Sequence, residues 1–227
     1  MPFSADDFFA VFARYNAAIW PLQVAACLAG ALAVACLPAR SRLATLTITL
    51  VLALMWAVNG VGYHWLHFAD INPVARVFAA LFVLQAFLLA ATGPRCRNLR
   101  FALAADARTV AGLALIGYAA VVYPLVGRMA GHTYPAVPVF GVAPCPTTIF
   151  TVGLLLLAPL RDVRWLWPVP LAWSGIGGSA AVLLDVPQDD QDVLSRCEVL
   201  AAVSYMLHLA KHEPGYRLDD QDHFANR

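Results

Sequence analysis

Four side chains of the kinds that bind transition metals lie in two stretches of the chain. His64 and His67 are three residues apart, a spacing that places two side chains on one face of an α-helix. His132 and Cys145 follow further along the chain. Because imidazole and thiolate suit zinc and copper, these residues are a candidate zinc or copper site. The alternative is that the histidines satisfy loop carbonyls.

A wider set of polar residues could bind a small solute or an ion. Arg76 and Arg128 would each form a structural ion pair with Asp70 or Asp185, extend outward to water, or contact an anionic ligand. The threonines after Cys145 would otherwise bond backbone carbonyls within the protein. The candidate ligand-binding residues are His64, His67, Asp70, Asn72, Arg76, Arg128, His132, Cys145, Thr147, Thr148, Asp185 and Gln188.

The thiol of Cys145 has two open interpretations. Cys145 precedes Pro146, a residue that suits the first turn of a helix. A thiol at the positive end of a helix dipole is reactive, which would allow thiol chemistry. Cys197 is the one other cysteine expected on the same side of the membrane, so a disulfide between Cys145 and Cys197 is the direct competitor.

The composition excludes most soluble classes of protein. Of the 227 residues, 61% are hydrophobic and 13% are charged, whereas about a quarter of a soluble domain is charged. The formal net charge is +1, so no basic surface for nucleic acid is available. These values predict a polytopic membrane protein. They exclude a soluble enzyme, a disordered tail and a fibrous repeat.

Seven apolar segments approach the length of about 20 residues that a membrane-spanning helix needs. The seventh carries Arg196 and Glu198 near its start, which a helix tolerates at the membrane interface or inside a bundle. The fold class is therefore all-α, a transmembrane bundle of seven helices. The predicted spans are residues 17–37, 44–65, 73–92, 109–129, 146–160, 165–184 and 193–210.

The loops between these spans alternate in charge, so that positive charge gathers on one side of the bundle. It follows the first, third, fifth and seventh spans, at Arg40, Arg42, Arg95, Arg97, Arg100, Arg108, Arg161, Arg164, Lys211 and Arg217. The segment after the sixth span is acidic. The positive-inside rule then places the C-terminus in the cytoplasm and the N-terminus outside. In this orientation the candidate ligand-binding residues all lie at the outer ends of their helices.

Residues 1–16 form a separate predicted element. Ser4 and Asp7 have the spacing of a capping box, and apolar residues with helical periodicity follow. We expect a short amphipathic helix in the outer membrane interface. The alternative is a frayed lead-in to the first span. The seven-helix domain covers residues 17–210, and residues 211–227 form a polar cytoplasmic tail.

Polar and small residues inside the spans predict how the helices associate. Gln23, Asn59 and Gln85 should form interhelical hydrogen bonds, with a polar path from the outer face as the alternative. The small residues within 174–179 predict that the sixth span is the tightly packed central helix. Pro124 predicts a kink in the fourth span.

Three stretches of the chain carry a family resemblance: YHWLHFADINP at 63–73, PCPTTIFT at 144–151, and GGSAA followed by VPQD within 177–189. With these runs the chain resembles a bacterial membrane-protein family that is defined only as a domain of unknown function. The resemblance covers nearly the whole chain. It implies a multi-pass protein of the bacterial inner membrane and no particular activity.

The polar outer ends favour binding or transport of a small solute or ion. A structural or accessory subunit of a larger membrane complex is the alternative, and a thiol- or metal-dependent enzyme is a third hypothesis. The expected partners are the lipid bilayer and either further copies of the chain or a larger complex. Nucleic acid is not an expected partner.

Overall fold

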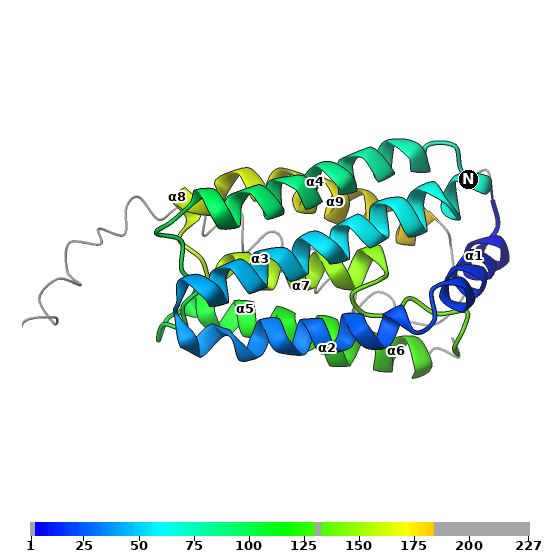
Figure 1. The fold of residues 1–227 in the computed structure, drawn as a ribbon. Coiled ribbons are helices and arrows are strands. Elements are labelled where there is room, and N and C mark those ends of the chain that lie inside the picture. Colours follow the sequence, from blue (N-terminus) through cyan, green and yellow to red (C-terminus); the bar gives the residue numbers. More distant parts are fainter. Residues whose placement is uncertain (1–2, 130–132, 184–227) are drawn as a thin grey trace, which may run out of the picture. The chain divides into compact units, whose positions relative to one another are not determined.

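The computed structural model describes residues 3–129 and 133–183, and every regular element in these ranges is a helix (Figure 1). The predicted seventh span and the C-terminal tail lie outside the described residues. The elements are α1 (Ala5–Ala18), α2 (Leu22–Ala35), η1 (Leu37–Ala39), α3 (Arg42–Ala57), η2 (Val58–Trp65), η3 (Phe68–Asp70), α4 (Ala75–Arg95), α5 (Ala107–Gly117), η4 (Tyr118–Val122), α6 (Tyr123–Met129), α7 (Pro144–Leu156), α8 (Leu160–Val163), η5 (Arg164–Leu166) and α9 (Pro168–Leu183).

Continuous helical stretches long and apolar enough to cross a membrane number four in the described residues. They are Leu22–Ala39, Arg42–Asp70, Ala75–Arg95 and Ala107–Met129, and they coincide with the first four predicted spans. The predicted fifth span, residues 146–160, overlaps α7, which has 13 residues and begins at Pro144. At about 1.5 Å per residue α7 is about 20 Å long, which is shorter than the hydrocarbon core of a bilayer. The described residues therefore support four membrane-length helices.

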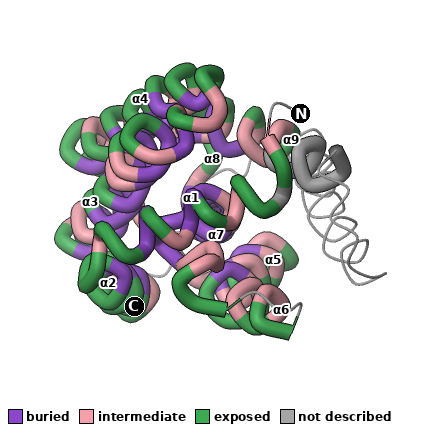
Figure 2. The backbone as a smooth tube through the Cα atoms, turned by 90° about the vertical axis from the view of Figure 1, so that its right-hand side faces the viewer, coloured by how far each residue is buried: buried purple, intermediate pink, exposed green. Residues whose placement is uncertain are grey.

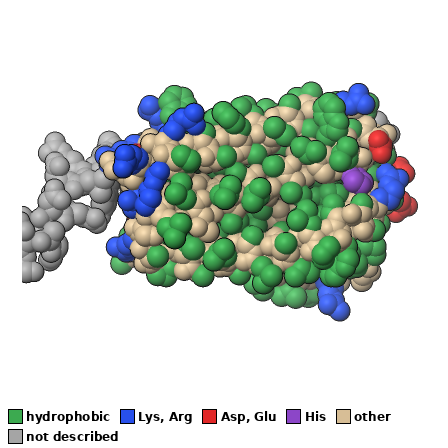
Figure 3. Space-filling view, in the orientation of Figure 1, with side chains coloured by type: hydrophobic (Ala, Val, Ile, Leu, Met, Phe, Trp, Pro, Cys, Tyr) green, Lys and Arg blue, Asp and Glu red, His purple; other side chains and the backbone are tan. Residues whose placement is uncertain are grey.

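The sides of these helices carry large apolar side chains on their outer faces. Leu28 is 67% exposed, Phe87 64% and Val110 69%. Figure 3 shows apolar side chains over the flanks and charged side chains at the two ends. A continuous apolar surface of this kind is typical of a protein surrounded by lipid. Length, composition and surface thus agree on a membrane protein.

The most buried of the described helices is α7, which packs against α3, α5 and α9 (Figure 2). The Trp56 indole of α3 donates a hydrogen bond of 2.8 Å to the Thr151 hydroxyl of α7. Where α5 crosses α7, a Cβ on Gly112 would lie 2.8 Å from the Gly153 carbonyl oxygen. Gly175 in α9, in contrast, has no atom within 4 Å of such a Cβ. The prediction that the sixth span is the tightly packed central helix is therefore wrong at Gly175. The close approach lies between α5 and α7.

Two of the long helices contain π-helical turns. In η2, the Asn59 side chain donates a hydrogen bond of 2.8 Å to the Met55 carbonyl one turn earlier, competing with the backbone for that acceptor. In η4, the π turn ends just before Pro124, which has no N–H to continue an α-helical ladder. The disturbance predicted at Pro124 thus takes the form of a wider turn.

Helix α1 lies across the end of the bundle (Figure 1). The predicted capping box is present, because the Ser4 hydroxyl accepts from the Asp7 N–H at 3.2 Å and the Asp7 carboxylate accepts from the Ser4 N–H at 3.0 Å. The Tyr15 hydroxyl donates to the Val142 carbonyl at 2.9 Å, and the Asn16 amide donates to the carbonyl of Val137 at 2.7 Å. Val11, Phe12 and Tyr15 are buried, so this apolar face of α1 is covered by its own protein.

Candidate functional site

A fully buried histidine lies inside an aromatic box at the α1 end of the bundle. His64 in η2 is 0% exposed. Its ring centroid lies 4.6 Å from that of Phe82, 4.9 Å from Trp173 and 5.8 Å from Phe78. Tyr63 completes the box at 5.1 Å. The side chains come from η2, α4 and α9, so the box forms where three segments distant in sequence meet.

Several polar atoms in this box have no hydrogen-bond partner. Both ring nitrogens of His64 and the Tyr63 hydroxyl are buried and unpartnered. Buried polar groups in folded proteins are nearly always paired, and each exception calls for an explanation such as a bound ligand, water or ion. Packing alone does not explain the imidazole, because an apolar ring would fill the same space without unpaired nitrogens.

The start of α7 borders the same box. The Cys145 thiol lies beside the Tyr123 hydroxyl and the Trp173 indole, and the Tyr63 hydroxyl lies near the same thiol. Tyr63 belongs to η2, and Tyr123 follows η4 directly. The two π turns therefore both meet the first turn of α7. We call Tyr63, His64, Cys145 and Trp173 the His64 cluster.

The His64 cluster offers hydrogen bonds without charge. A hydroxyl and an indole N–H are donors, and a neutral imidazole has one donor and one acceptor nitrogen. Among the described residues, the groups that face His64 are aromatic rings. Burial of a charged imidazolium without a carboxylate beside it would cost several kcal/mol, on the order of the penalty for any buried unpaired ion. The imidazole is therefore neutral here.

His67 does not share the surroundings of His64, although the sequence places both on one helical face. The His67 Nδ1 lies 2.8 Å from the Gly62 carbonyl oxygen, and its ring packs against Tyr15 of α1 at 5.3 Å. A carbonyl only accepts, so Nδ1 carries the proton. The expectation of a common face assumed α-helical periodicity, and the π winding of η2 turns the two rings toward different neighbours. His67 thus bonds a backbone carbonyl, as in the stated alternative, but this carbonyl belongs to the helix η2 and not to a loop.

The charged candidates lie at the same end but on its surface. Asp70, Arg76 and Arg128 are exposed. The Arg76 guanidinium lies over the Trp65 ring at 6.0 Å, and no ion pair joins it to Asp70 within the part of the chain that is described. The Asn72 side chain accepts from the Val74 N–H at 3.2 Å, a local turn contact. None of these residues contributes to the His64 cluster.

The threonines and amides bond within the bundle, as predicted. The Thr148 hydroxyl donates to the Pro144 carbonyl at 2.8 Å. Asn59 donates to the Thr147 hydroxyl at 3.2 Å, which joins η2 to α7. Gln85 donates to the Leu166 carbonyl at 2.9 Å, and Gln23 donates to the Asn16 carbonyl at 2.8 Å. These contacts give the residues structural roles.

His132, Asp185 and Gln188 lie outside the described residues, as does Cys197, so their positions relative to His64 are not described. Within residues 3–129 and 133–183, no group of three or more histidine, cysteine, aspartate or glutamate side chains is arranged to hold a metal ion. Cys145 is a free thiol there. Of the predicted site residues, the structure brings together His64 and Cys145.

Sequence reasoning missed the aromatic members of the cluster. Trp173 lies in an apolar segment and resembles ordinary core, and Tyr63 was noted only as a neighbour of His64. The available signal was their position in the sequence. Tyr63 precedes His64 and Trp173 precedes Ser174, each within an otherwise apolar helix. Only the packing of α9 against α7 reveals that Trp173 connects His64 to Cys145.

In its described residues the protein is all-helical, with four membrane-length apolar helices and a buried aromatic box. A model described as a family of unknown function (DUF6064) matches residues 5–212. The chain belongs to this family, which confirms the resemblance to a family of unknown function. No curated protein matches the chain. No solved structure matches it either.

Proposed function

We propose that the chain is an integral membrane protein that binds a small, uncharged, flat cyclic ligand with carbonyl acceptors at the His64 cluster. The observation that carries this proposal is the pair of unpartnered ring nitrogens on a fully buried His64. An unpaired buried polar group costs about 1–3 kcal/mol. A ligand that accepts a hydrogen bond would repay this cost, because it would give the imidazole N–H a partner.

The walls of the site favour one class of ligand. Phe78 and Phe82 present aromatic rings, whereas Tyr63 and Trp173 present donors. A flat ring that bears carbonyl acceptors matches both features. A charged solute would find no opposite charge among the described neighbours of His64. Quinones have the required chemistry, and they reach a membrane protein through the bilayer.

Binding requires the cluster to open, because its polar atoms are enclosed in this structure. The π turns η2 and η4 border the cluster on two sides. Turns of this kind are frequent at functional sites, and the extra residue they hold lets a helix change its winding locally. We assign the opening movement to these two turns.

The number of spans and their orientation in the membrane belong to the same proposal. We propose seven spans in a bacterial inner membrane, with the N-terminus outside and the basic helix ends in the cytoplasm. The His64 cluster would then lie near the outer leaflet, where a lipid-borne ligand could be bound or transported. An impermeant maleimide should label Arg128→Cys and not Arg97→Cys in intact cells. The reverse labelling would overturn the orientation.

Thermal unfolding of the purified protein tests ligand binding. Duroquinone supplies a ring with two carbonyl acceptors, and durene has the same methylated ring without them. We expect duroquinone to raise the melting temperature of the wild type and durene to leave it unchanged. His64→Phe should remain folded and lose the response. Equal effects of the two compounds, or an undiminished response of His64→Phe, would contradict the proposal.

Zinc and copper(I) ions provide the comparison for the metal hypothesis. Stabilisation by either ion and not by duroquinone would replace the proposed ligand with a metal bound at His64, His67, His132 and Cys145. His67→Phe separates the two cases, because His67 belongs to the metal set and lies outside the aromatic box. A metal response should disappear in this variant, whereas a duroquinone response should persist.

A further inference from the structure

The two ends of the bundle differ strongly in charge. The end formed by η1, the loop from α4 to α5, and α8 holds eight arginines and two aspartates among the described residues, a side-chain charge of +6. We call it the basic end; its charged residues are Arg40, Arg42, Arg95, Arg97, Arg100, Asp106, Arg108, Arg161, Asp162 and Arg164. The opposite end holds three arginines and three aspartates, a side-chain charge of zero.

Many of the arginines at the basic end are held in place by uncharged partners. Arg42 donates to the Gly93 and Pro94 carbonyls at 2.8 Å each, at the C-terminus of α4. Arg108 donates to the Ala158 carbonyl at 3.1 Å, beyond the C-terminus of α7. Contacts of this type stabilise helix ends. They order the guanidinium groups and leave the positive charge in place.

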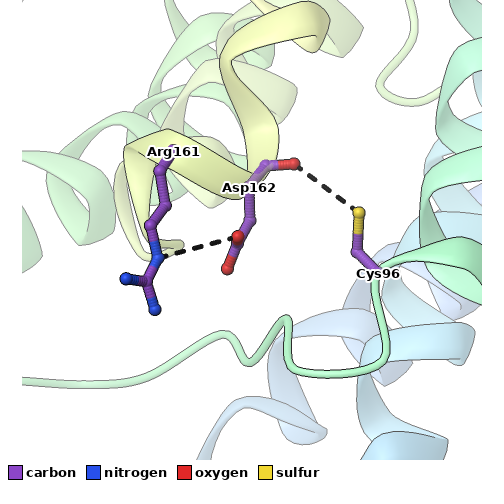
Figure 4. Close-up of polar contacts among 3 residues, drawn as sticks. All are labelled: Cys96, Arg161 and Asp162. Atoms are coloured by element: carbon purple, nitrogen blue, oxygen red, sulfur yellow. Dashed lines mark hydrogen bonds and ion pairs between the residues drawn. The ribbon is translucent and has the colours of Figure 1, made fainter.

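Carboxylates neutralise little of this charge. Arg161 Nε lies 3.8 Å from the Asp162 carboxylate, and the Cys96 thiol contacts the Asp162 backbone carbonyl (Figure 4). Asp106 accepts from the Thr109 N–H at 2.8 Å and so caps α5. Arg95 and Arg97 are exposed, and no ion pair involves either of them in the described residues.

The charge lies next to surface that faces lipid. Leu43, which follows Arg42, is 73% exposed, and Trp165 is 65% exposed. The Arg164 guanidinium lies over the Trp165 ring at 4.7 Å. Exposed Trp beside arginine is typical of the headgroup level of a bilayer. This pattern favours a position of the guanidinium groups at the depth of lipid phosphates.

We propose that the basic end is a binding surface for the headgroups of anionic phospholipids, with Arg95 and Arg97 free to contact the phosphates. Charge complementarity and the neighbouring apolar surface favour lipid, because a soluble polyanion would gain nothing from Leu43 and Trp165. This inference concerns the opposite end of the bundle from the His64 cluster and does not depend on it.

Native mass spectrometry of the full chain in detergent tests the proposal. Phosphatidylglycerol should remain bound at higher occupancy than phosphatidylcholine, and added salt should reduce the difference. Arg95→Gln with Arg97→Gln should weaken phosphatidylglycerol binding about fivefold for each arginine removed. Neither side chain supports the fold through an ion pair in the described residues, so the variant should melt like the wild type.

The matched control is Arg76→Gln with Arg128→Gln at the opposite end, which removes the same charge and should leave lipid binding unchanged. Equal retention of the two lipids, or an equal loss in the control variant, would overturn the proposal. Polyuridylic acid serves as a soluble polyanion. Its binding in place of phosphatidylglycerol would identify a different partner and would likewise overturn the proposal.

Discussion

The imidazole of His64 and the indole of Trp173 meet edge to face with their centroids 4.9 Å apart, and neither ring nitrogen of His64 has a hydrogen-bond partner. His64 belongs to η2 and Trp173 to α9, so this contact joins two distant segments at the centre of the site. Aromatic pairs in this geometry are attractive. The contact therefore holds the cluster together while its polar atoms remain free for a ligand.

Replacing His64 by phenylalanine should stabilise the ligand-free protein. Phenylalanine keeps the edge-to-face contacts with Trp173 and Phe82 and removes two unpartnered nitrogens. We expect the free energy of unfolding to rise by about 1 kcal/mol. The melting temperature in one detergent measures the effect. His67→Phe is the control, because it loses the hydrogen bond to Gly62 and should be destabilised. A His64→Phe protein that is destabilised as much as His67→Phe would show a structural role for His64.

Removing only one partner of the hydrogen bond between Trp56 and Thr151 should destabilise the protein, because the other partner is left unpaired. Thr151→Val leaves the buried Trp56 N–H without an acceptor, which should cost about 1–3 kcal/mol. Trp56→Phe adds a small cavity of its own. In a double-mutant cycle, Thr151→Val should cost less in the Trp56→Phe background than in the wild type. Strict additivity of the two costs would show that the two side chains do not interact.

The crossing of α5 and α7 should tolerate no side chain at Gly112. An alanine Cβ there would meet the Gly153 carbonyl at 2.8 Å and Leu157 at 2.9 Å. We expect Gly112→Ala to cost about 1–3 kcal/mol, seen as a lower melting temperature. Gly117→Ala in the same helix meets nothing within 4 Å and should be neutral or slightly stabilising. Similar effects at the two glycines would contradict the close crossing.

The attachment of helix α1 to the loop at residues 135–137 should depend on Asn16. The Asn16 amide donates to the Pro135 carbonyl at 2.6 Å and to the Val137 carbonyl at 2.7 Å. Asn16→Ala should therefore speed backbone hydrogen exchange across α1. Arg14→Ala, an exposed change on the same helix, should leave exchange as it is. Unchanged protection of α1 in Asn16→Ala would show that apolar packing alone holds the helix.

Alkaline pH should weaken the attachment of α1 to the bundle, because it ionises the Tyr15 hydroxyl. Burial raises the pKa of Tyr15 above its ordinary value, so the folded state favours the protonated hydroxyl that donates to Val142. A raised pKa gives stability that is complete below the unfolded value of about 10 and is lost as the pH rises further. The melting temperature of the wild type should therefore fall toward that of Tyr15→Phe above pH of about 10. A constant difference across this range would contradict the assignment.

Local patterns in the sequence predicted several elements correctly. The spacing of Ser4 and Asp7 predicted the capping box, and the apolar lengths predicted the four long helices. Asn59 and Gln85 were expected to hydrogen-bond between helices because no water reaches them, and they do. These predictions succeeded because each depends on near neighbours or on the cost of an unpaired group.

Features that depend on packing between distant segments were not predictable. The spacing of His64 and His67 indicated one shared face, and the π winding of η2 separates them. The glycines of α9 suggested a central helix, whereas the buried position belongs to α7, which is shorter than a membrane span. Trp173 gave no sign of its role because its neighbours are known only once α9 packs on α7.

The most direct measurement of the central claim is the nitrogen-15 resonance of the His64 ring in histidine-labelled protein held in lipid nanodiscs, assigned by its loss in His64→Phe. Duroquinone should shift this resonance while durene leaves it in place, because only duroquinone has a carbonyl that can accept a hydrogen bond from the imidazole N–H. A His64 resonance that stays fixed at saturating duroquinone, or that moves equally with durene, would contradict the proposed ligand site.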